Sequence, residues 1–104
     1  MGGEKNKEKI IKKIKEFKNK IKADKIIIFG SYVSGNFTED SDIDLLLVSK
    51  KFRGKDFHER FKGLWLKWNL KLPVDFLCYT PEEFEKLKKG ITIVREAVEN
   101  GIEV

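Results

Sequence analysis

The sequence predicts a single α/β domain of the mixed α+β type, with a small mixed sheet of three to four strands and helices packed on it. Two observations lead to this class. Three short apolar runs, at residues 26–29, 42–49 and 73–79, have the length and composition of buried strands. Segments with apolar residues at helical spacing flank these runs. With 104 residues, of which 40% are hydrophobic, one core is expected across residues 1–104.

The first predicted element is an amphipathic helix over residues 4–22. Its polar face is nearly all lysine, and residues 1–25 carry a net charge of +6 while the rest of the chain carries −1. We interpret this face first as a solvated helix surface, and binding of nucleic acid through Lys12, Lys13 and Lys15 as its less favoured use. The apolar stripe of the helix consists of Ile10, Ile14, Phe17 and Ile21.

A Gly-Ser pair follows the first predicted strand. The run at residues 26–29 is rich in β-branched side chains and predicts a buried strand that ends at Gly30, where the backbone must turn sharply. A short helix is expected from Ser31 to about residue 35. Residues 36–41 are mostly polar and predict a loop before the second strand.

A loop at residues 50–55 and a helix over residues 56–70 are expected next. Large apolar residues recur in this second segment at helical spacing, so the helix is expected to turn an aromatic face to the core. His58, the only histidine, lies beside that face, and we assign it to the exposed surface rather than to catalysis. The expected inner face consists of Phe57, Phe61, Leu64, Trp65 and Trp68.

The last part of the chain predicts a strand, two helices and a short final strand. The third strand, at residues 73–79, contains Cys78, which we interpret as a small buried hydrophobe. Thr80 is a good helix N-cap, with proline and glutamate at the helix positions that favour a start. Gly90 weakens the helical stripe that follows, so two pieces are expected before residues 102–104 form the last strand.

Composition excludes several broad classes of protein. The apolar runs are far shorter than the roughly 20 residues of a membrane span. The lysine-rich start lacks the apolar core of a secretory signal, and a single cysteine fits a reducing compartment. We therefore expect a cytoplasmic protein without membrane contact; no pattern in the sequence assigns an oligomeric state.

The candidate functional residues begin with a Gly-Ser pair and two aspartates. Asp42 and Asp44 are spaced i, i+2 at the entrance of the second strand, so their side chains are expected to project to the same side. Two adjacent like charges favour a bound cation, and Mg²⁺ accepts one or two carboxylates together with substrate phosphates. Gly30 permits close approach of the backbone, and the amides that follow, with the Ser31 hydroxyl, are suited to a triphosphate.

Asp75 interrupts the third predicted strand. If this strand lies beside the second, Asp75 would bind the ion that activates an acceptor hydroxyl and would help to remove its proton. Taken alone, it would be a strand-edge acid. A phosphatase-type Asp-x-Asp motif fits less well, because in that class the pair follows the apolar run and here it precedes it. A nuclease would share the metal ions but use water as the acceptor.

These motifs together resemble the nucleotidyltransferase superfamily of DNA polymerase β and kanamycin nucleotidyltransferase, and most closely its minimal nucleotidyltransferases. The residues that carry the resemblance are Gly30, Ser31 and Gly35, then Asp42, Asp44 and Asp75. The resemblance covers almost the whole chain and implies a nucleotidyltransferase fold. It implies that Asp42, Asp44 and Asp75 are catalytic and bind one or two Mg²⁺ ions. Gly30 and Ser31 would bind ATP or another NTP.

The resemblance also implies a function. Such an enzyme transfers NMP, here expected to be AMP from ATP, to a hydroxyl of a separate macromolecule, because no second domain for a small acceptor is expected. Minimal members are commonly paired with a HEPN-domain protein, for which they serve as antitoxin. The family's arginine is replaced by Ser34, and Lys50 or Arg53 are candidates to supply the missing charge. The alternative is a catalytically weak or inactive binding module that neutralises a partner by complex formation.

Overall fold

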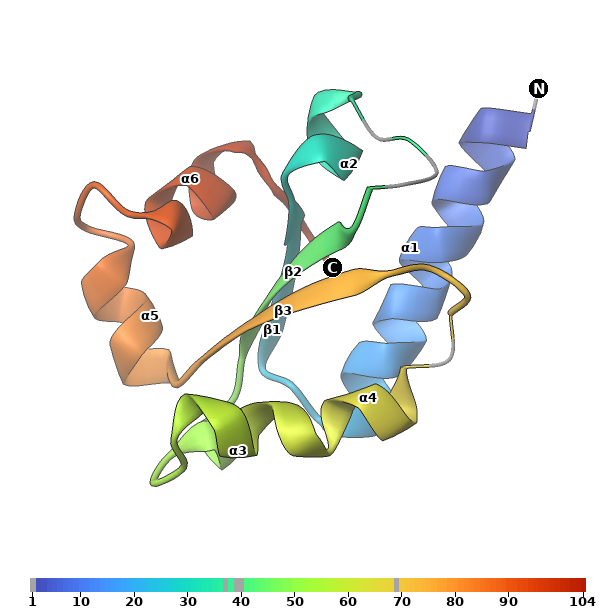
Figure 1. Ribbon diagram of the computed structural model, residues 1–104. Coiled ribbons are helices and arrows are strands. Elements are labelled where there is room, and N and C mark those ends of the chain that lie inside the picture. The colour runs from blue at the N-terminus through green and yellow to red at the C-terminus, as the bar shows by residue number, and fades with distance from the viewer. Residues whose placement is uncertain (1, 37, 39–40, 69) are drawn as a thin grey trace.

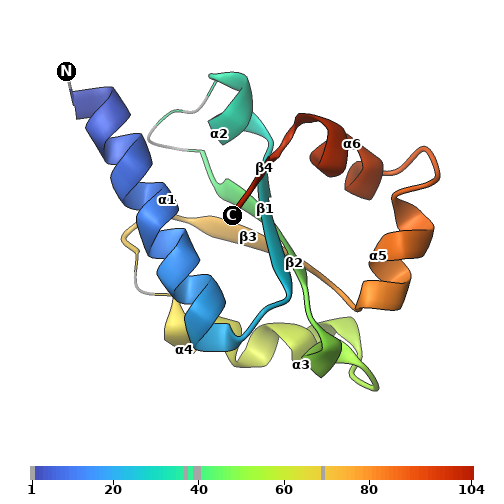
Figure 2. The ribbon, with the colours of Figure 1, turned by 180° about the vertical axis from the view of Figure 1, so that it is seen from behind.

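A four-stranded mixed sheet with the strand order β3-β2-β1-β4 forms the centre of the molecule, and helices cover both of its faces (Figure 1; Figure 2). This computed structural model describes residues 2–36, 38, 41–68 and 70–104. It confirms the expected fold class. In chain order the elements are α1 (Gly2–Ile21), β1 (Lys25–Phe29), α2 (Ser31–Ser34), β2 (Ile43–Val48), the 3₁₀ helix η1 (Lys50–Phe52), α3 (Phe57–Lys62), α4 (Leu64–Lys67), β3 (Val74–Tyr79), α5 (Pro81–Leu87), α6 (Ile93–Asn100) and β4 (Ile102–Glu103).

The pairing of the strands fixes which residues become neighbours. β1 runs antiparallel to both β2 and β4, whereas β2 and β3 are parallel. In this register Asp44 lies opposite Phe29 on one side and opposite Asp75 on the other. Since parallel neighbours in register project to the same face, the start of β2 and the start of β3 present their carboxylates side by side.

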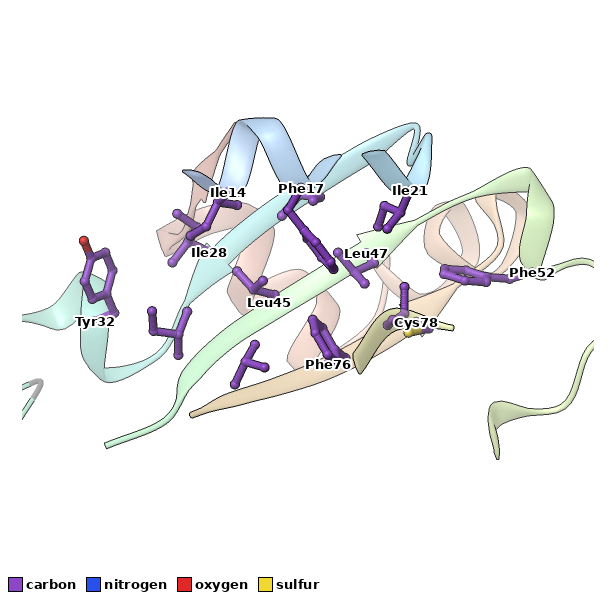
Figure 3. Packing of buried hydrophobic residues seen from close by; sticks show 14 residues of the cluster. Ile14, Phe17, Ile21, Ile28, Tyr32, Leu45, Leu47, Phe52, Phe76 and Cys78 are labelled. Atoms are coloured by element: carbon purple, nitrogen blue, oxygen red, sulfur yellow. The ribbon is translucent and has the colours of Figure 1, made fainter. Parts of the chain in front are cut away.

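The larger core lies between the sheet and α1, α3 and α4. The stripe of α1 enters this core as expected, with Ile14, Phe17 and Ile21 buried (Figure 3). Phe17 stacks on Phe76 of β3, with ring centroids 5.7 Å apart. Cys78 is also buried here, and burial raises the pKa of its thiol to about 12, so it behaves as an inert apolar residue.

A smaller core lies on the opposite face, beneath α5 and α6. Phe84 of α5 and Val94 and Ala97 of α6 pack there against alternate side chains of the sheet. Leu46 and Val48 supply this face from β2, whereas Asp44, two residues earlier, stands on the same face at the sheet's end. The strand is thus apolar along most of this face and becomes acidic only where it begins.

The expected helix over residues 56–70 is two short helices, which corrects the sequence-based prediction. α3 ends at Lys62 and α4 begins at Leu64, with Gly63 between them. The aromatic stripe does not face inward along its whole length: Phe57 and Trp65 are 56% and 54% exposed. Asn69 lies outside the described residues.

Other boundaries shift by smaller amounts. The loop expected at residues 50–55 contains η1, and Asp42 lies just before β2 rather than in it. Ile91, assigned to the helical stripe, lies in the turn between α5 and α6 and is 99% exposed. His58 is exposed as expected, and the final strand β4 is present. None of the helices in the described ranges combines the length and apolar character needed to cross a bilayer.

A buried arginine ties α3 to β3 and α5. The Arg60 guanidinium donates to the carbonyl oxygens of Lys55 and Cys78 at 2.9 and 3.0 Å, and to the Glu83 carboxylate at 2.7 and 3.2 Å. The Glu83 carboxylate also accepts from the Thr80 amide, which completes the capping box of α5. These contacts hold the pKa of Glu83 below its usual range, chiefly through the Arg60 hydrogen bonds.

Replacing Arg60 with methionine is expected to destabilise the fold by about 2–3 kcal/mol, because the Cys78 carbonyl loses a buried donor and Glu83 loses its partner. The depressed pKa of Glu83 contributes stability above the carboxyl's unfolded pKa, and that stability is lost as pH falls through the folded value. Urea unfolding from pH 3 to 7 should therefore show a weaker acid dependence in Arg60→Met. An identical pH dependence in both proteins would contradict this account.

Candidate active site

The three predicted aspartates lie at the same end of the sheet. Asp44 and Asp75 are register partners in the parallel strands β2 and β3, which settles the question of whether the third strand lies beside the second. Asp42 stands two residues before Asp44 and is exposed. The sequence pattern could not show this arrangement, because parallel pairing joins residues that are 31 positions apart.

Burial and neighbouring negative charges both act on the Asp44 carboxyl. The pKa of its carboxyl is raised, first because the side chain is partly desolvated and then because of the negative charges of Asp75 and Asp42, in that order. Two neighbouring negative charges disfavour the ionised form of a carboxyl group, whereas a bound cation favours that form. The three aspartates singled out from the sequence therefore lie close enough to interact electrostatically.

Gly30 lets the backbone pass directly beside Asp44. Its φ of 78° and ψ of −150° belong to a region that side chains strongly disfavour. A Cβ atom at this position would overlap with Oδ2 of Asp44 and would lie 3.1 Å from its Cγ. Glycine is thus required here both by conformation and by the close approach of the carboxylate.

The helix that follows Gly30 is a single short turn. Ser31 opens α2, and the amides of Val33 and Ser34 donate to the Gly30 carbonyl. Gly35 ends the turn in the left-handed conformation, as its φ of 91° shows. The Gly-Ser pair therefore stands on a sharply turned segment at the end of β1, next to the aspartates.

A pocket of about 470 Å³ lies between residues of α2 and residues of α6. Figure 1 shows these two helices at the same end of the sheet. Two of its lining residues, Glu96 and Asn100, were not singled out from the sequence; they lie one helical turn apart on α6. Their spacing could have been read from the chain, but only the fold places α6 beside α2. The lining residues are Phe29, Gly30, Val33, Ser34, Glu96 and Asn100.

The structure rules out the two candidates for the missing positive charge. Lys50 and Arg53 follow the far end of β2, at the opposite end of the sheet from Asp44. The Lys50 amide donates to Asp24, and Arg53 forms an ion pair with Glu82. Of the described residues that line the pocket beside Ser34, the one with a charged side chain is Glu96.

The aspartates have the donor chemistry that magnesium requires. Carboxylate oxygens are hard ligands, and Asp44 with its two neighbours supplies them at one edge of the sheet. Within the described ranges, no three or more His, Cys, Asp or Glu side chains already stand in a metal-ligating cluster. The fit to a divalent cation rests instead on the chemistry of the carboxylate oxygens and on the shared location of the three aspartates at one end of the sheet.

Comparison with a family model identifies the architecture. The model for the nucleotidyltransferase domain matches residues 7–102. The chain belongs to the nucleotidyltransferase domain family. This membership places Gly30, Ser31 and the three aspartates in a domain of known enzyme type, and the chain is accordingly a nucleotidyltransferase.

Two proteins of Methanocaldococcus jannaschii have sequences similar to this chain. The "Putative protein adenylyltransferase MJ0141" of Methanocaldococcus jannaschii is 36% identical over 102 residues, which cover 91% of this chain and 98% of the relative. The "Putative protein adenylyltransferase MJ0604" of the same organism is 54% identical over 43 residues, or 36% of this chain and 43% of the relative. The first similarity extends over nearly the full length of both proteins.

Two solved structures share the nucleotidyltransferase fold. One, described as a putative nucleotidyltransferase from Sulfolobus solfataricus, has a TM-score of 0.54 at 23% identity and matches 70% of this chain and 65% of its own. Another, also described as a putative nucleotidyltransferase, has a TM-score of 0.50 at 31% identity and matches 76% of this chain and 87% of its own. The expected fold family is thus confirmed.

Gly30→Ala is expected to destabilise the protein by about 1–3 kcal/mol and to displace Asp44, because the new methyl group meets Oδ2 in a strained backbone. Gly35→Ala is the matched control: Gly35 also has a positive φ, but no atom of the described residues, its two chain neighbours apart, lies within 4 Å of the added Cβ. Chemical denaturation and the carboxyl NMR resonance of Asp44 measure the two effects. An unmoved Asp44 resonance in Gly30→Ala would refute the proposed close contact.

Asp75→Asn is expected to lower the pKa of Asp44, and by more than Asp42→Asn does, because the Asp75 charge is the larger of the two repulsions. The raised pKa of Asp44 in the folded state means that folding disfavours its ionised carboxylate. The resulting loss of stability develops as pH rises through that pKa. Asp75→Asn should therefore be slightly more stable than the wild type at pH 7. Carbon-detected NMR titration of Asp44 gives the pKa; a larger effect of Asp42→Asn would contradict the order.

Proposed function

We propose that this nucleotidyltransferase transfers NMP, specifically AMP from Mg-ATP, to a hydroxyl group of a partner protein. The observation that carries the proposal is the pairing of Asp44 with Asp75 beside Gly30. This pairing groups three carboxylates at one end of the sheet, next to a backbone turn that is suited to binding phosphates. The description of a relative of nearly equal length as a putative protein adenylyltransferase supports a protein as the acceptor.

Each residue has a proposed role in the reaction. Gly30 and Ser31 bind the triphosphate through backbone amides and the serine hydroxyl. Asp42 and Asp44 would hold one or two Mg²⁺ ions, and Asp75 would complete the ligand set. A bound Mg²⁺ ion neutralises phosphate charge and polarises the α-phosphorus. Asp75 also orients the acceptor hydroxyl and accepts its proton, because it lies across Asp44 from the Gly-Ser segment.

The proposed acceptor is a HEPN-domain protein, the partner that the resemblance to minimal nucleotidyltransferases implies. In this proposal AMP transfer inactivates the partner, and the nucleotidyltransferase is the antitoxin of the pair. The exposed side chain of Asp75 supports a large acceptor, because a macromolecule can reach it without entering a closed cavity.

A second candidate function is supported by the rim of the pocket. Ser34 stands where the family pattern has arginine, and Glu96 is acidic. An acidic rim binds a triphosphate less well than a basic one, which favours a weak or inactive enzyme that neutralises its partner by complex formation alone. The retained repulsion at Asp44 argues against this alternative, because a pure binding module gains nothing from it.

Incubation with α-³²P-ATP, Mg²⁺, host lysate and the HEPN-domain protein should label a protein band. The Asp42→Asn/Asp44→Asn double variant, shown to be folded by circular dichroism, should lose at least about 100-fold of the labelling, because removal of transition-state charge stabilisation costs several kcal/mol. Trials with the other three NTPs define the base preference. A partner that is bound and neutralised without label, with all four nucleotides, would establish the binding module instead.

A further inference from the structure

The pocket between α2 and α6 adjoins the carboxylates and shares their face of the sheet. Phe29 and Gly30 line it, and both flank Asp44: Phe29 is its register partner, and the Gly30 backbone closely approaches its carboxylate. Leu77, two residues after Asp75, packs in the same core as Phe29, so Asp75 projects toward this face as well. A nucleotide whose phosphates lie at the carboxylates therefore has the pocket within reach.

The wall of the pocket that α6 contributes is held firmly against the sheet. Val94 and Ala97 of α6 are fully buried in the smaller core. Gly101, which follows the helix, lies so close to β1 that a Cβ atom there would stand 2.6 Å from Ile27 Cγ2 and 2.7 Å from the Ile28 carbonyl oxygen. The last turn of α6 therefore has a position fixed by packing.

Two polar side chains on this wall have no partner in the part of the chain that the structure describes. Glu96 and Asn100 lie one turn apart on the same side of α6, and both are exposed. The Glu96 carboxylate and the Asn100 amide form no ion pair or side-chain hydrogen bond there, whereas Arg95 and Glu99 on the same helix pair with each other. Both groups are thus available to a ligand in the pocket.

The lining of the pocket suits the uncharged part of a nucleotide. Phe29 and Val33 are apolar, and Ser34, with the two side chains of α6, adds a few polar groups, the usual composition of a small-molecule site. The Glu96 carboxylate repels phosphate, and it accepts hydrogen bonds but cannot donate them. A nucleoside provides the matching groups, because it has a flat apolar base, N–H donors and ribose hydroxyl groups.

The order of the two side chains along α6 assigns each to one part of the nucleoside. Asn100 directly precedes Gly101, which packs on Ile28 of β1, so it lies at the end of α6 that is attached to β1, near the turn at Gly30. Glu96 lies about 6 Å further along the helix axis. Since the ribose of a nucleotide separates the phosphates from the base, Asn100 is assigned to the ribose and Glu96 to the base.

We propose that the pocket between α2 and α6 binds the nucleoside of ATP, with the Glu96 carboxylate accepting a hydrogen bond from the 6-amino group of adenine and the Asn100 amide bonded to a ribose hydroxyl group. This inference rests on the proposed function and names the residues that select its nucleotide. A nucleotide without the amino group leaves the carboxylate without a donor and binds less tightly.

Two ATP analogues test the two contacts separately. Purine riboside triphosphate has a hydrogen atom in place of the 6-amino group, and 2′,3′-dideoxy-ATP lacks both ribose hydroxyl groups. Calorimetry in the presence of Mg²⁺ gives the affinity of each analogue and of ATP for the wild type, Glu96→Ala and Asn100→Ala. Glu99→Ala is the matched control, because it removes the same charge from α6 at a side chain that pairs with Arg95 and does not line the pocket.

The wild type and Glu99→Ala are expected to bind ATP about tenfold more tightly than purine riboside triphosphate and about fivefold more tightly than dideoxy-ATP. In Glu96→Ala the first preference should vanish and the second should remain. Asn100→Ala should show the reverse. The ratio of two affinities cancels the effect of the lost charge on the triphosphate, which all three nucleotides share, and a variant with a damaged fold would not lose one preference alone.

Several results would overturn the inference. Equal affinity of the wild type for ATP and purine riboside triphosphate, or an unchanged preference in Glu96→Ala, would overturn it while AMP transfer to a protein, measured in parallel with α-³²P-ATP, leaves the proposed function intact. Selective binding without transfer to any protein would overturn the proposed function alone. A wild type that binds none of the three nucleotides would overturn both.

Discussion

The parallel register of β2 and β3 is the constraint on which the rest of the structure depends. It places Asp44 beside Asp75 and so creates a local concentration of negative charge at one end of an otherwise apolar sheet. Two features hold Asp44 and Asp75 in place. The core between α1 and the sheet fixes the strands, and the backbone turn at Gly30 packs directly against the Asp44 carboxylate. The repulsion among the carboxylates is tolerated because burial of the surrounding apolar residues stabilises the fold independently of them.

Much of this fold could be predicted from the chain because local signals agreed with the tertiary structure. The stripe containing Ile14 and Phe17 is buried, and the capping box at Thr80 starts a helix where the sequence indicates one. The register of Asp44 and Asp75 could not be derived from spacing alone, since parallel pairing is a non-local choice. The sequence does not reveal the helix break at Gly63 for a different reason. The helical spacing of the aromatic residues continues across this glycine, although it separates two short helices.

The candidate site shows a similar division between local and non-local information. The motif residues Gly30 and Asp42 could be found because their chemistry and spacing are specific. Glu96 and Asn100 carry no comparable signal, and their relevance arises only because α6 lies across a pocket from α2. The same pocket explains why Ser34 matters: with Lys50 and Arg53 at the far end of the sheet, the described lining contributes no positive side chain. In the proposed function, binding of a triphosphate there would depend on backbone amides, hydroxyl groups and a bound cation.

The Arg60 guanidinium, which caps the Cys78 carbonyl, has a consequence for behaviour at high concentration. A fully open six-residue edge strand could recruit identical chains one after another and seed aggregates. Because Arg60 occupies one end of the edge, an added strand can form only a short ladder of hydrogen bonds. So short a ladder does not hold two edge strands together without complementary side chains. Arg60 therefore limits how far two copies of this edge could pair with each other.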